Sequence, residues 1–378
     1  MNFMNIQEEI VMSLELNKEF GSIITRLISK ENLSRSEAER AFVMVLNNQV
    51  TDMQQGAFLA ALTAKGETDR EVAGAWDAIY NLDTVHVELD IGIQAVDNSG
   101  TGMDTFKTFN ISTAASIIAA AGKVHMARHG ARAITSVCGT VDMAQALGVD
   151  VECSADIVGA SIEKSGIGLF NGMSPNIHPM ALGRILSQIY FGSTLNIAAS
   201  LANPALPSTG VRGVYSMGMI QPVARVMKEI GYKSAIVLHG CIKGSDLGMD
   251  EASVCGITHC ARIFNDGSIK EFIIDPEKLG IGLKNPEELV PEKDIEKEAK
   301  RFAALIAGRD STARKDAAIL NAGLIFLAAD RVDSLESGIE KAADLLDSGM
   351  ALKTLEKWVT SQNSDPGSGL KKLHSLMP

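Results

Sequence analysis

Two glycine-rich loops constrain the fold of this chain more than any other feature. The first begins at Asp97 and reads D-N-S-G-T-G-M-D-T-F-K-T-F-N-I-S-T; the second begins at Arg128 and reads R-H-G-A-R-A-I-T-S-V-C-G-T. Each follows a short apolar run that predicts a β-strand, at Ala95–Val96 and at Val124–Ala127. Backbone N–H groups freed by glycine, beside Ser or Thr hydroxyls at a helix start, form a site for phosphate. The stretch Asp97–Asp142 therefore predicts a cradle for a di- or triphosphorylated small molecule, and the simpler alternative is a pair of solvated loops.

Two further groups of charged residues fit a phosphate site. Arg128, His129 and Arg132 bring positive or potentially positive side chains to the second loop. Asp250–Glu251 follows an apolar strand and lies in a glycine-flanked loop. Mg²⁺ is held by one or two carboxylates together with substrate phosphates, so this pair complements the glycine loops. Taken alone, such a pair is more often simply solvated.

The first ninety or so residues are predicted to be helical. Three helix starts share one capping device, a hydroxyl followed three residues later by Glu or Gln. These pairs are Ser34 with Glu37, Thr51 with Gln54, and Thr68 with Glu71. Residues 1–16 resemble an amphipathic extension whose partner the sequence does not identify.

Strands and helices alternate after this region, which predicts a mostly parallel sheet with helices on its faces. Val85–Leu89 alternates and predicts a strand, and Asn265–Asp266–Gly267 between two apolar runs predicts a hairpin. The last fifteen or so residues contain P-G-S-G and are predicted to be a frayed tail. The fold class is therefore α/β, with a small N-terminal helical domain and a larger domain built on a mostly parallel central sheet. We expect the helical domain over 1–90, joined in space by part of 166–207, and the phosphate-binding domain over 91–165 and 208–378.

Composition excludes several classes of protein. Apolar residues make up 46% and charged residues 21% of the 378, which is typical of a globular chain. The net charge of −11 argues against a nonspecific nucleic-acid or membrane binder. Apolar runs stay short of the roughly 20 residues that span a bilayer, and the N-terminus lacks the pattern of a signal peptide. The five cysteines form no C-x-x-C pair, so free thiols in a reducing cytoplasm are expected and a zinc site is not.

Taken together, these motifs resemble the anthranilate phosphoribosyltransferase family. The resemblance runs from about Leu27 to Leu355 and includes Q-Q-G-A-F-L-A-A-L-T-A-K-G-E-T, the two glycine loops, G-x-D-E and D-A-A-I-L-N-A-G at 316–323. It implies a homodimeric enzyme of tryptophan biosynthesis with a small helical domain and a larger α/β domain. Such an enzyme moves the phosphoribosyl group of phosphoribosyl pyrophosphate (PRPP) onto the amino nitrogen of anthranilate, releases pyrophosphate and uses one or two Mg²⁺ ions.

The resemblance also implies roles for individual residues. It assigns donor contacts to Gly100, Met103, Asp104, Thr108, Asn110, Ile111, Ser112, Thr113, Arg128, His129, Gly130, Arg132, Thr135, Ser136 and Thr140. It assigns acceptor contacts to Gly100, His129, Ala131 and Arg184, and metal ligation to Ser112, Asp250 and Glu251. No acid or base is assigned, because an aromatic amine is already neutral and nucleophilic at pH 7.

The chain departs from the family pattern mainly where the acceptor would bind. The family's K-H-G-N-R is R-H-G-A-R here, and S-S-K-S-G-S is T-S-V-C-G-T. Met103 replaces a glycine of G-T-G-G-D. The segment from His178 to Asn196 is about two residues shorter, which leaves Arg184 as the nearest substitute for the arginine that pairs the anthranilate carboxylate. A different aromatic or nucleobase-like acceptor, and a non-catalytic paralogue that binds nucleic acid or a partner protein, are the alternatives.

Overall fold

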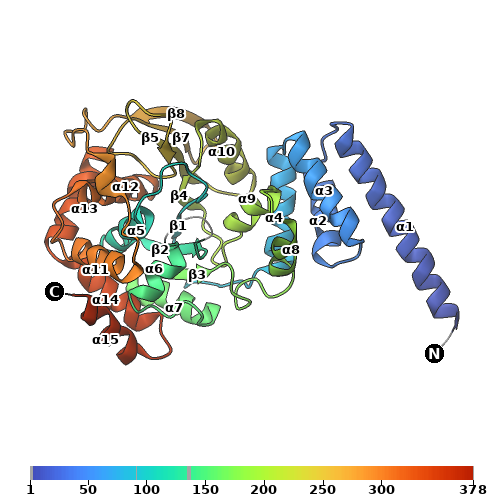
Figure 1. Ribbon diagram of the computed structural model, residues 1–378, viewed down its shortest axis with the longest axis horizontal. Helices are drawn as coiled ribbons and strands as arrows, with labels where there is room; N and C mark the ends of the chain where they lie inside the picture. Colours follow the sequence, from blue (N-terminus) through green and yellow to red (C-terminus); the bar gives the residue numbers. More distant parts are fainter. Residues whose placement is uncertain (1–2, 91, 134–137, 378) are drawn as a thin grey trace. The chain divides into compact units, whose positions relative to one another are not determined.

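A computed structural model of the chain describes residues 3–90, 92–133 and 138–377, with side chains from residue 14 onward (Figure 1). The contacts divide the chain into two units. One comprises Met1–Val85 with Ile177–Ala202, and the other comprises His86–Asn176 with Asn203–Pro378. Each is described by itself below.

The smaller unit is made of helices that begin where the capping pattern predicts. Its helices are α1 (Phe3–Ile28), α2 (Arg35–Leu46), α3 (Asp52–Lys65), α4 (Asp69–Asp83), α8 (Leu182–Ile189) and α9 (Thr194–Leu201). The hydroxyls of Ser34, Thr51 and Thr68 each accept the backbone N–H three residues later. The three predicted starts are therefore confirmed, and each cap supplies an acceptor that the first turn of its helix lacks.

The segment that holds α8 and α9 packs on the N-terminal helices through specific bonds. The Asp83 carboxylate accepts the N–H groups of Met180, Ala181 and Leu182 at 2.5, 3.0 and 2.7 Å. These bonds satisfy N–H groups at the start of α8, where a helix has no internal acceptors. The indole N–H of Trp76 donates to the carbonyl of Leu201 at 2.9 Å. Residues far apart in sequence thus form one helical unit.

The larger unit is built on an eight-stranded sheet with the order β3-β2-β1-β4-β5-β7-β8, in which β6 pairs with β5. Its strands are β1 (Ala95–Gly100), β2 (His125–Gly130), β3 (Ile167–Asn171), β4 (Thr209–Gly213), β5 (Ser234–Cys241), β6 (Gly248–Met249), β7 (Thr258–Ile263) and β8 (Ile269–Ile274). Five neighbouring strands run parallel, namely β3, β2, β1, β4 and β5. The strand β6 and the β7–β8 hairpin are antiparallel. The predicted fold class and the predicted hairpin are therefore confirmed.

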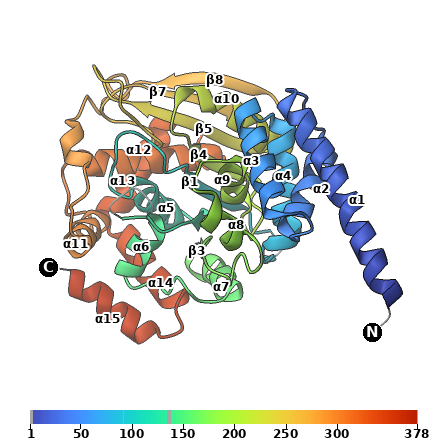
Figure 2. The ribbon, with the colours of Figure 1, turned by 45° about the vertical axis from the view of Figure 1, so that its right-hand side comes forward.

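Helices cover the sheet in the way that a parallel sheet requires. Those that pack on its strands are α5 (Ile111–Ala121), α7 (Ala155–Ser165), α10 (Ile220–Glu229) and α12 (Ala313–Ala328). The unit also contains α6 (Thr140–Ala146), α11 (Ile295–Ile306), α13 (Leu335–Asp347), α14 (Met350–Ser361) and α15 (Pro366–Leu376). Figure 2 shows α5 and α12 on one side of the sheet and α10 on the other. Val96 of β1, Met126 of β2 and most buried apolar residues of α5 and α12 belong to one core.

Two sequence expectations are wrong. Val85–Leu89 is extended but is no strand, because its N–H groups bond to loop carbonyls: Val85 to Ile177 and Val87 to Pro204. The expected frayed tail is the helix α15, in which Leu373 is fully buried. Asp365 caps this helix and Pro366 occupies its first turn, where proline is tolerated.

Three short strands were not predicted from the sequence, namely β3, β4 and the two-residue strand β6. β3 and β4 read I-G-L-F-N and T-G-V-R-G, too short and too rich in glycine to be recognised.

Within the described part of the chain, no helix is long and apolar enough to cross a membrane.

Candidate metal and diphosphate site

Glycines at the ends of three neighbouring strands make room for the acidic loop that follows β6. A Cβ on Gly100 would clash with the Asp250 carboxylate, and one on Gly213 would clash with the Asp250 carbonyl oxygen. A Cβ on Gly240 would clash with the carbonyl oxygen of Glu251. Because only glycine allows such close approach, β1, β4 and β5 together hold Asp250 and Glu251 at the carboxyl edge of the sheet.

Three carboxylates meet at this edge. One oxygen from each of Asp104, Asp250 and Glu251 can be chosen so that all lie within 4.8 Å of one another, and the three residues are 7–9% exposed. Asp104 comes from the first glycine loop, so residues about 150 positions apart converge. The sequence assigned Asp104 to donor contacts; the structure adds it to the candidate metal ligands.

Hydroxyl and ammonium groups of the first loop contact these carboxylates. The hydroxyls of Ser112 and Thr108 donate to the two oxygens of Glu251 at 3.3 and 3.4 Å. The Lys107 ammonium donates to Asp104 at 2.8 Å. The backbone N–H of Gly102 donates to Asp250 at 2.6 Å. The first loop and the Asp250–Glu251 pair are thus one structural unit.

Burial and mutual repulsion disfavour negative charge on this cluster. Burial, together with the charge of Asp250, raises the pKa of Asp104 to about 6. Burial first, and then the charges of Asp250 and Asp104, raise the pKa of Glu251 well above its usual value. A divalent cation would relieve this repulsion, and the ligands on offer are the hard oxygens that Mg²⁺ prefers. The residues present therefore fit Mg²⁺.

Asn321 on α12 bonds to the backbone next to the Asp250–Glu251 pair. Its side chain accepts the N–H of Ala252 at 2.9 Å and donates to the carbonyl of Ala252 at 3.0 Å. Because Ala252 follows Glu251 directly, this pair of bonds sets the backbone that carries both carboxylates. The sequence placed Asn321 within the family motif at 316–323 but gave it no role; a buried amide in an apolar helix is the signal that could have revealed one.

The second glycine loop lies at the end of β2, next to β1. Arg128 and His129 are buried, at 1% and 6% exposure, whereas Ala131 is exposed. Gly130 leaves space for Thr140, whose methyl group would lie 3.0 Å from an added Cβ. Gly172 leaves space in the same way for the His129 ring, which a Cβ would meet at 2.6 Å, and the sequence did not identify that glycine.

The Arg132 side chain connects the second loop to the residues that follow it. Its guanidinium donates to Asp142, Gln145 and Glu152 at 3.1, 2.8 and 2.9 Å. The Asp142 carboxylate in turn accepts the N–H groups of Ala133 and Gly139 at 2.8 and 3.0 Å. Thr135 and Ser136, which the sequence assigned to the donor, lie outside the described residues.

Arg184 belongs to the helical unit, and its guanidinium is engaged there. It donates to the Gln55 side chain at 3.0 Å and to the Val45 carbonyl at 2.8 Å. The structure thus assigns it contacts with α2 and α3. Its expected role toward an acceptor carboxylate stays a prediction.

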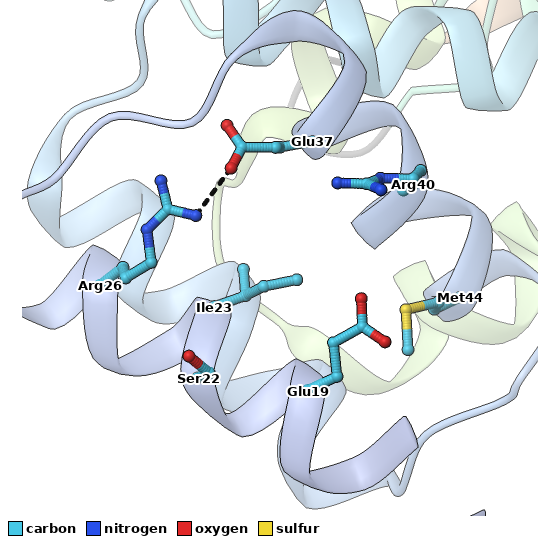
Figure 3. A pocket seen from close by; sticks show the side chains of 7 residues that line it. All are labelled: Glu19, Ser22, Ile23, Arg26, Glu37, Arg40 and Met44. Carbon is cyan, nitrogen blue, oxygen red and sulfur yellow. Dashed lines mark hydrogen bonds and ion pairs between the residues drawn. The ribbon is translucent and has the colours of Figure 1, made fainter. Parts of the chain in front are cut away.

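A pocket of about 180 Å³ lies elsewhere, between α1 and α2 of the helical unit (Figure 3). Across it the Arg26 guanidinium donates to the Glu37 carboxylate at 2.7 Å. Its lining is Glu19, Ser22, Ile23, Arg26, Glu37, Arg40 and Met44. It shares no residue with the carboxylate cluster, whose groups carry the candidate chemistry.

Comparisons with known proteins agree over nearly the whole chain. Residues 92–352 match the model of a glycosyl transferase family a/b domain, and residues 21–82 match that family's helical bundle domain. The chain is 33% identical to the anthranilate phosphoribosyltransferase of Methanothermobacter marburgensis over 351 residues, covering 90% of this chain and 98% of that relative. It is 35% identical to that of Anaeromyxobacter sp. over 339 residues, covering 89% and 96% of the two chains.

Solved structures are similar over an equally large share of the chain. The anthranilate phosphoribosyltransferase of Thermus thermophilus superposes with a TM-score of 0.80 at 29% identity, over 90% of this chain and 99% of that one. That of Saccharomyces cerevisiae, solved with PRPP and Mg, gives a TM-score of 0.80 at 22% identity over 92% and 99%.

Proposed function

Because the chain belongs to the anthranilate phosphoribosyltransferase family, we propose that it transfers the phosphoribosyl group of PRPP to the amino nitrogen of anthranilate. The products are N-(5-phosphoribosyl)anthranilate and pyrophosphate, a step of tryptophan biosynthesis. The observation that carries the proposal is the cluster of Asp104, Asp250 and Glu251 beside a glycine loop that opens a helix.

The first loop and the start of α5 bind the diphosphate. N–H groups at a helix N-terminus favour an anion, and Asn110 at the cap makes no side-chain bond to them. Asp104, Asp250 and Glu251, with the Ser112 hydroxyl, hold Mg²⁺, which when bound neutralises the charge on the departing pyrophosphate. Thr108 and Lys107 keep two of these carboxylates in place.

No strong base is required of the chain. The bond from ribose C1 to the pyrophosphate oxygen breaks as C1 gains positive charge, and the neutral aromatic amine forms the new C1–N bond. The resulting anilinium is acidic and gives its proton to water or to the departing pyrophosphate. The contribution of this protein is therefore to orient the two substrates and to stabilise the leaving charge. His129, Ala131 and Gly100 bind the acceptor, and His129, Gly130, Arg132 and Thr140 bind the phosphoribosyl part of the donor.

The acceptor carboxylate needs a cationic partner once it is removed from water. Arg184 supplies it in this proposal by exchanging its bonds to Gln55 and the Val45 carbonyl for the carboxylate. We further propose a homodimer, and a cytoplasmic location that suits five free cysteines.

The test follows both substrates in one cuvette. Purified protein with Mg²⁺ and PRPP should consume anthranilate fluorescence and release one pyrophosphate per anthranilate lost. Pyrophosphate release without anthranilate consumption, in the presence of other aromatic amines, would favour the second candidate, a transferase with a different acceptor. The observation favouring that candidate is Ala131, which replaces the amide of the family's K-H-G-N-R.

A further inference from the structure

Arg128 is placed beneath the donor loop and not at its surface. Its side chain is 1% exposed, one of the largest fully buried side chains of the chain. Nη1 donates to the Thr113 hydroxyl at 2.7 Å, and Nε donates to the Asn98 carbonyl at 3.1 Å. Thr113, itself fully buried, lies in the first turn of α5. The guanidinium therefore links β2 both to β1 and to α5, the helix whose N-terminus is the proposed diphosphate site.

Asn98 on β1 holds the same turn of α5. Its amide donates to the Ser112 carbonyl at 2.9 Å and to the Ser116 hydroxyl at 3.1 Å. The Ser116 hydroxyl also donates to the Ser112 carbonyl, at 2.7 Å. Hydrogen bonds thus connect Asn98, Arg128, Thr113 and Ser116 around the first turn of α5. All four are buried, so these bonds are made away from competing water.

The charges of two carboxylates favour the charged form of this buried guanidinium. Burial lowers the pKa of Arg128 to about 10, while the charges of Asp97 and Glu251 favour the charged form. Arg128 is therefore a cation at neutral pH. Its charge acts on Glu251, a candidate metal ligand, from within the protein.

We propose that Arg128 is a positioning residue for the donor site: it fixes Thr113 and the first turn of α5, and it makes no contact with the donor. The turn that it fixes carries Ser112, whose hydroxyl reaches Glu251 at 3.3 Å. This inference rests on the proposed PRPP site. It revises the role that the family resemblance implies for position 128.

The geometry accounts for arginine where the family has lysine. The two acceptors, a hydroxyl on α5 and a carbonyl on β1, are served by two different nitrogens of one rigid guanidinium. Lysine keeps the charge but carries all its donors on a single nitrogen, so both acceptors would have to lie within reach of that one atom. Arg128→Lys therefore separates a charge contact from a positioning role.

The experiment measures binding of PRPP with Mg²⁺ by calorimetry to wild type, Arg128→Lys, Thr113→Val and the double variant. A bond to a charged group supports a loss of about tenfold to a hundredfold for each single variant. The double variant should lose no more PRPP affinity than the single variant with the larger loss, because both changes remove the same link. The KM for PRPP should rise while the KM for the acceptor stays within about twofold, a selectivity that general destabilisation would not give.

Two outcomes would overturn the inference. If Arg128→Lys binds PRPP as wild type does, the position needs only a charge and Arg128 is a donor contact. If the losses of the two single variants multiply in the double variant, Arg128 and Thr113 act independently. Thr113→Val preserves shape, so it keeps the test available if the arginine variant does not fold. Wild-type protein that binds no PRPP would instead refute the proposed function, and this inference with it.

Discussion

Asp250 is the residue on which the candidate site depends most. Its carboxylate accepts the Gly102 N–H at 2.6 Å and lies in the cluster with Asp104 and Glu251. Its backbone and side chain both touch glycines of neighbouring strands. The residue thus connects the metal cluster, the first loop and the edge of the sheet.

Asp250→Asn should abolish metal-dependent transfer with little loss of stability. The amide keeps the shape and one acceptor but removes the charge, so we expect activity to fall by about a hundredfold or more, in line with losses of other groups that stabilise leaving charge. Mn²⁺ binding measured by electron paramagnetic resonance should weaken in parallel. The control is Asp246→Asn, an exposed residue of the loop that precedes β6. An equal loss of melting temperature and activity would mean that Asp250 is structural.

Gly213→Ala tests the close approach of the sheet to the acidic loop. The added methyl group would overlap the Asp250 carbonyl oxygen, so the loop must move. We expect the free energy of unfolding to fall by about 1–3 kcal/mol, as for other overpacked sites, and Mn²⁺ binding to weaken. Urea titration measures the first effect. Gly218→Ala is the matched control, since nothing lies within 4 Å of its added Cβ; equal behaviour of the two variants would contradict the close-packing account.

At the scale of elements, the side chain that follows α14 bonds to an edge strand of the sheet. Gln362, fully buried after α14, donates to the Leu169 carbonyl at 2.9 Å and accepts the Leu169 N–H at 2.8 Å. Leu169 lies on β3, which is an edge strand of the sheet. The glutamine amide therefore pairs with the edge as another strand would, and covers it.

Gln362→Leu should destabilise the larger unit. It leaves the buried N–H and carbonyl of Leu169 without these partners, which costs about 2–4 kcal/mol in the free energy of unfolding. Chemical denaturation monitored by circular dichroism measures the change. Gln188→Leu, at an exposed position of α8, is the control. A variant as stable as wild type would show that β3 needs no such cover.

The Arg26–Glu37 pair predicts a pH dependence of the helical unit. Hydrogen bonds from Arg26 first, and then from the Ser34 backbone, lower the pKa of Glu37 to about 2. The stabilisation is therefore complete above the ordinary glutamate pKa, about 4.3, and is lost as the pH falls from there toward 2. The melting temperature of wild type should exceed that of Glu37→Gln at pH 7, and the gap should narrow below pH 4.5. Glu15→Gln, exposed on α1, should show no gap; a gap for Glu37→Gln that is constant with pH would contradict the account.

Local chemistry explains which elements could be predicted from the sequence. Caps at Ser34, Thr51 and Thr68 are decided within one helical turn, so their prediction needs no knowledge of the fold. Val85–Leu89 alternates as a strand does, but whether such a segment joins a ladder depends on distant partners. The same limit applies to Pro366, which begins α15 because Leu373 finds a buried place in the core.

The site was predictable to the extent that its ligands lie within motifs. The glycine loop and Asp250–Glu251 are contiguous in sequence, and their types indicate phosphate and a hard cation. Gly213, Gly240 and Asn321 were missed because their roles arise only when β4, β5 and α12 come together. The burial of Arg128 was equally invisible, since charged residues are almost always assumed to face solvent.

At the scale of the whole molecule, the chain keeps the family's sequence pattern better at the proposed donor site than at the proposed acceptor region. Apart from Met103, the family's pattern persists through the first loop and the acidic pair, and it changes at Ala131 and through the segment that holds Arg184. Gly100 and His129 are proposed to serve both substrates, whereas Ala131 and Arg184 are proposed to serve the acceptor alone. A transferase can therefore keep its donor chemistry while the residues specific to the acceptor change. The fold accommodates the change in a segment that belongs to the helical unit.

The proposed dimer is tested on the intact protein. Sedimentation equilibrium should give twice the chain mass of 40.2 kDa at micromolar concentration. Salt at 0.5 M should leave the dimer intact if its contacts are mainly apolar. A mass of one chain throughout would contradict the homodimer.

The central claim is that the first glycine loop and the carboxylates of Asp104, Asp250 and Glu251 form one metal-dependent diphosphate site. Calorimetric titration of PRPP into the protein, with Mg²⁺ and then with EDTA, tests it most directly. We predict saturable binding of one PRPP per chain with Mg²⁺ and a loss of at least about a hundredfold in affinity with EDTA. Absence of binding at millimolar PRPP with Mg²⁺, or equal binding in EDTA, would contradict the claim.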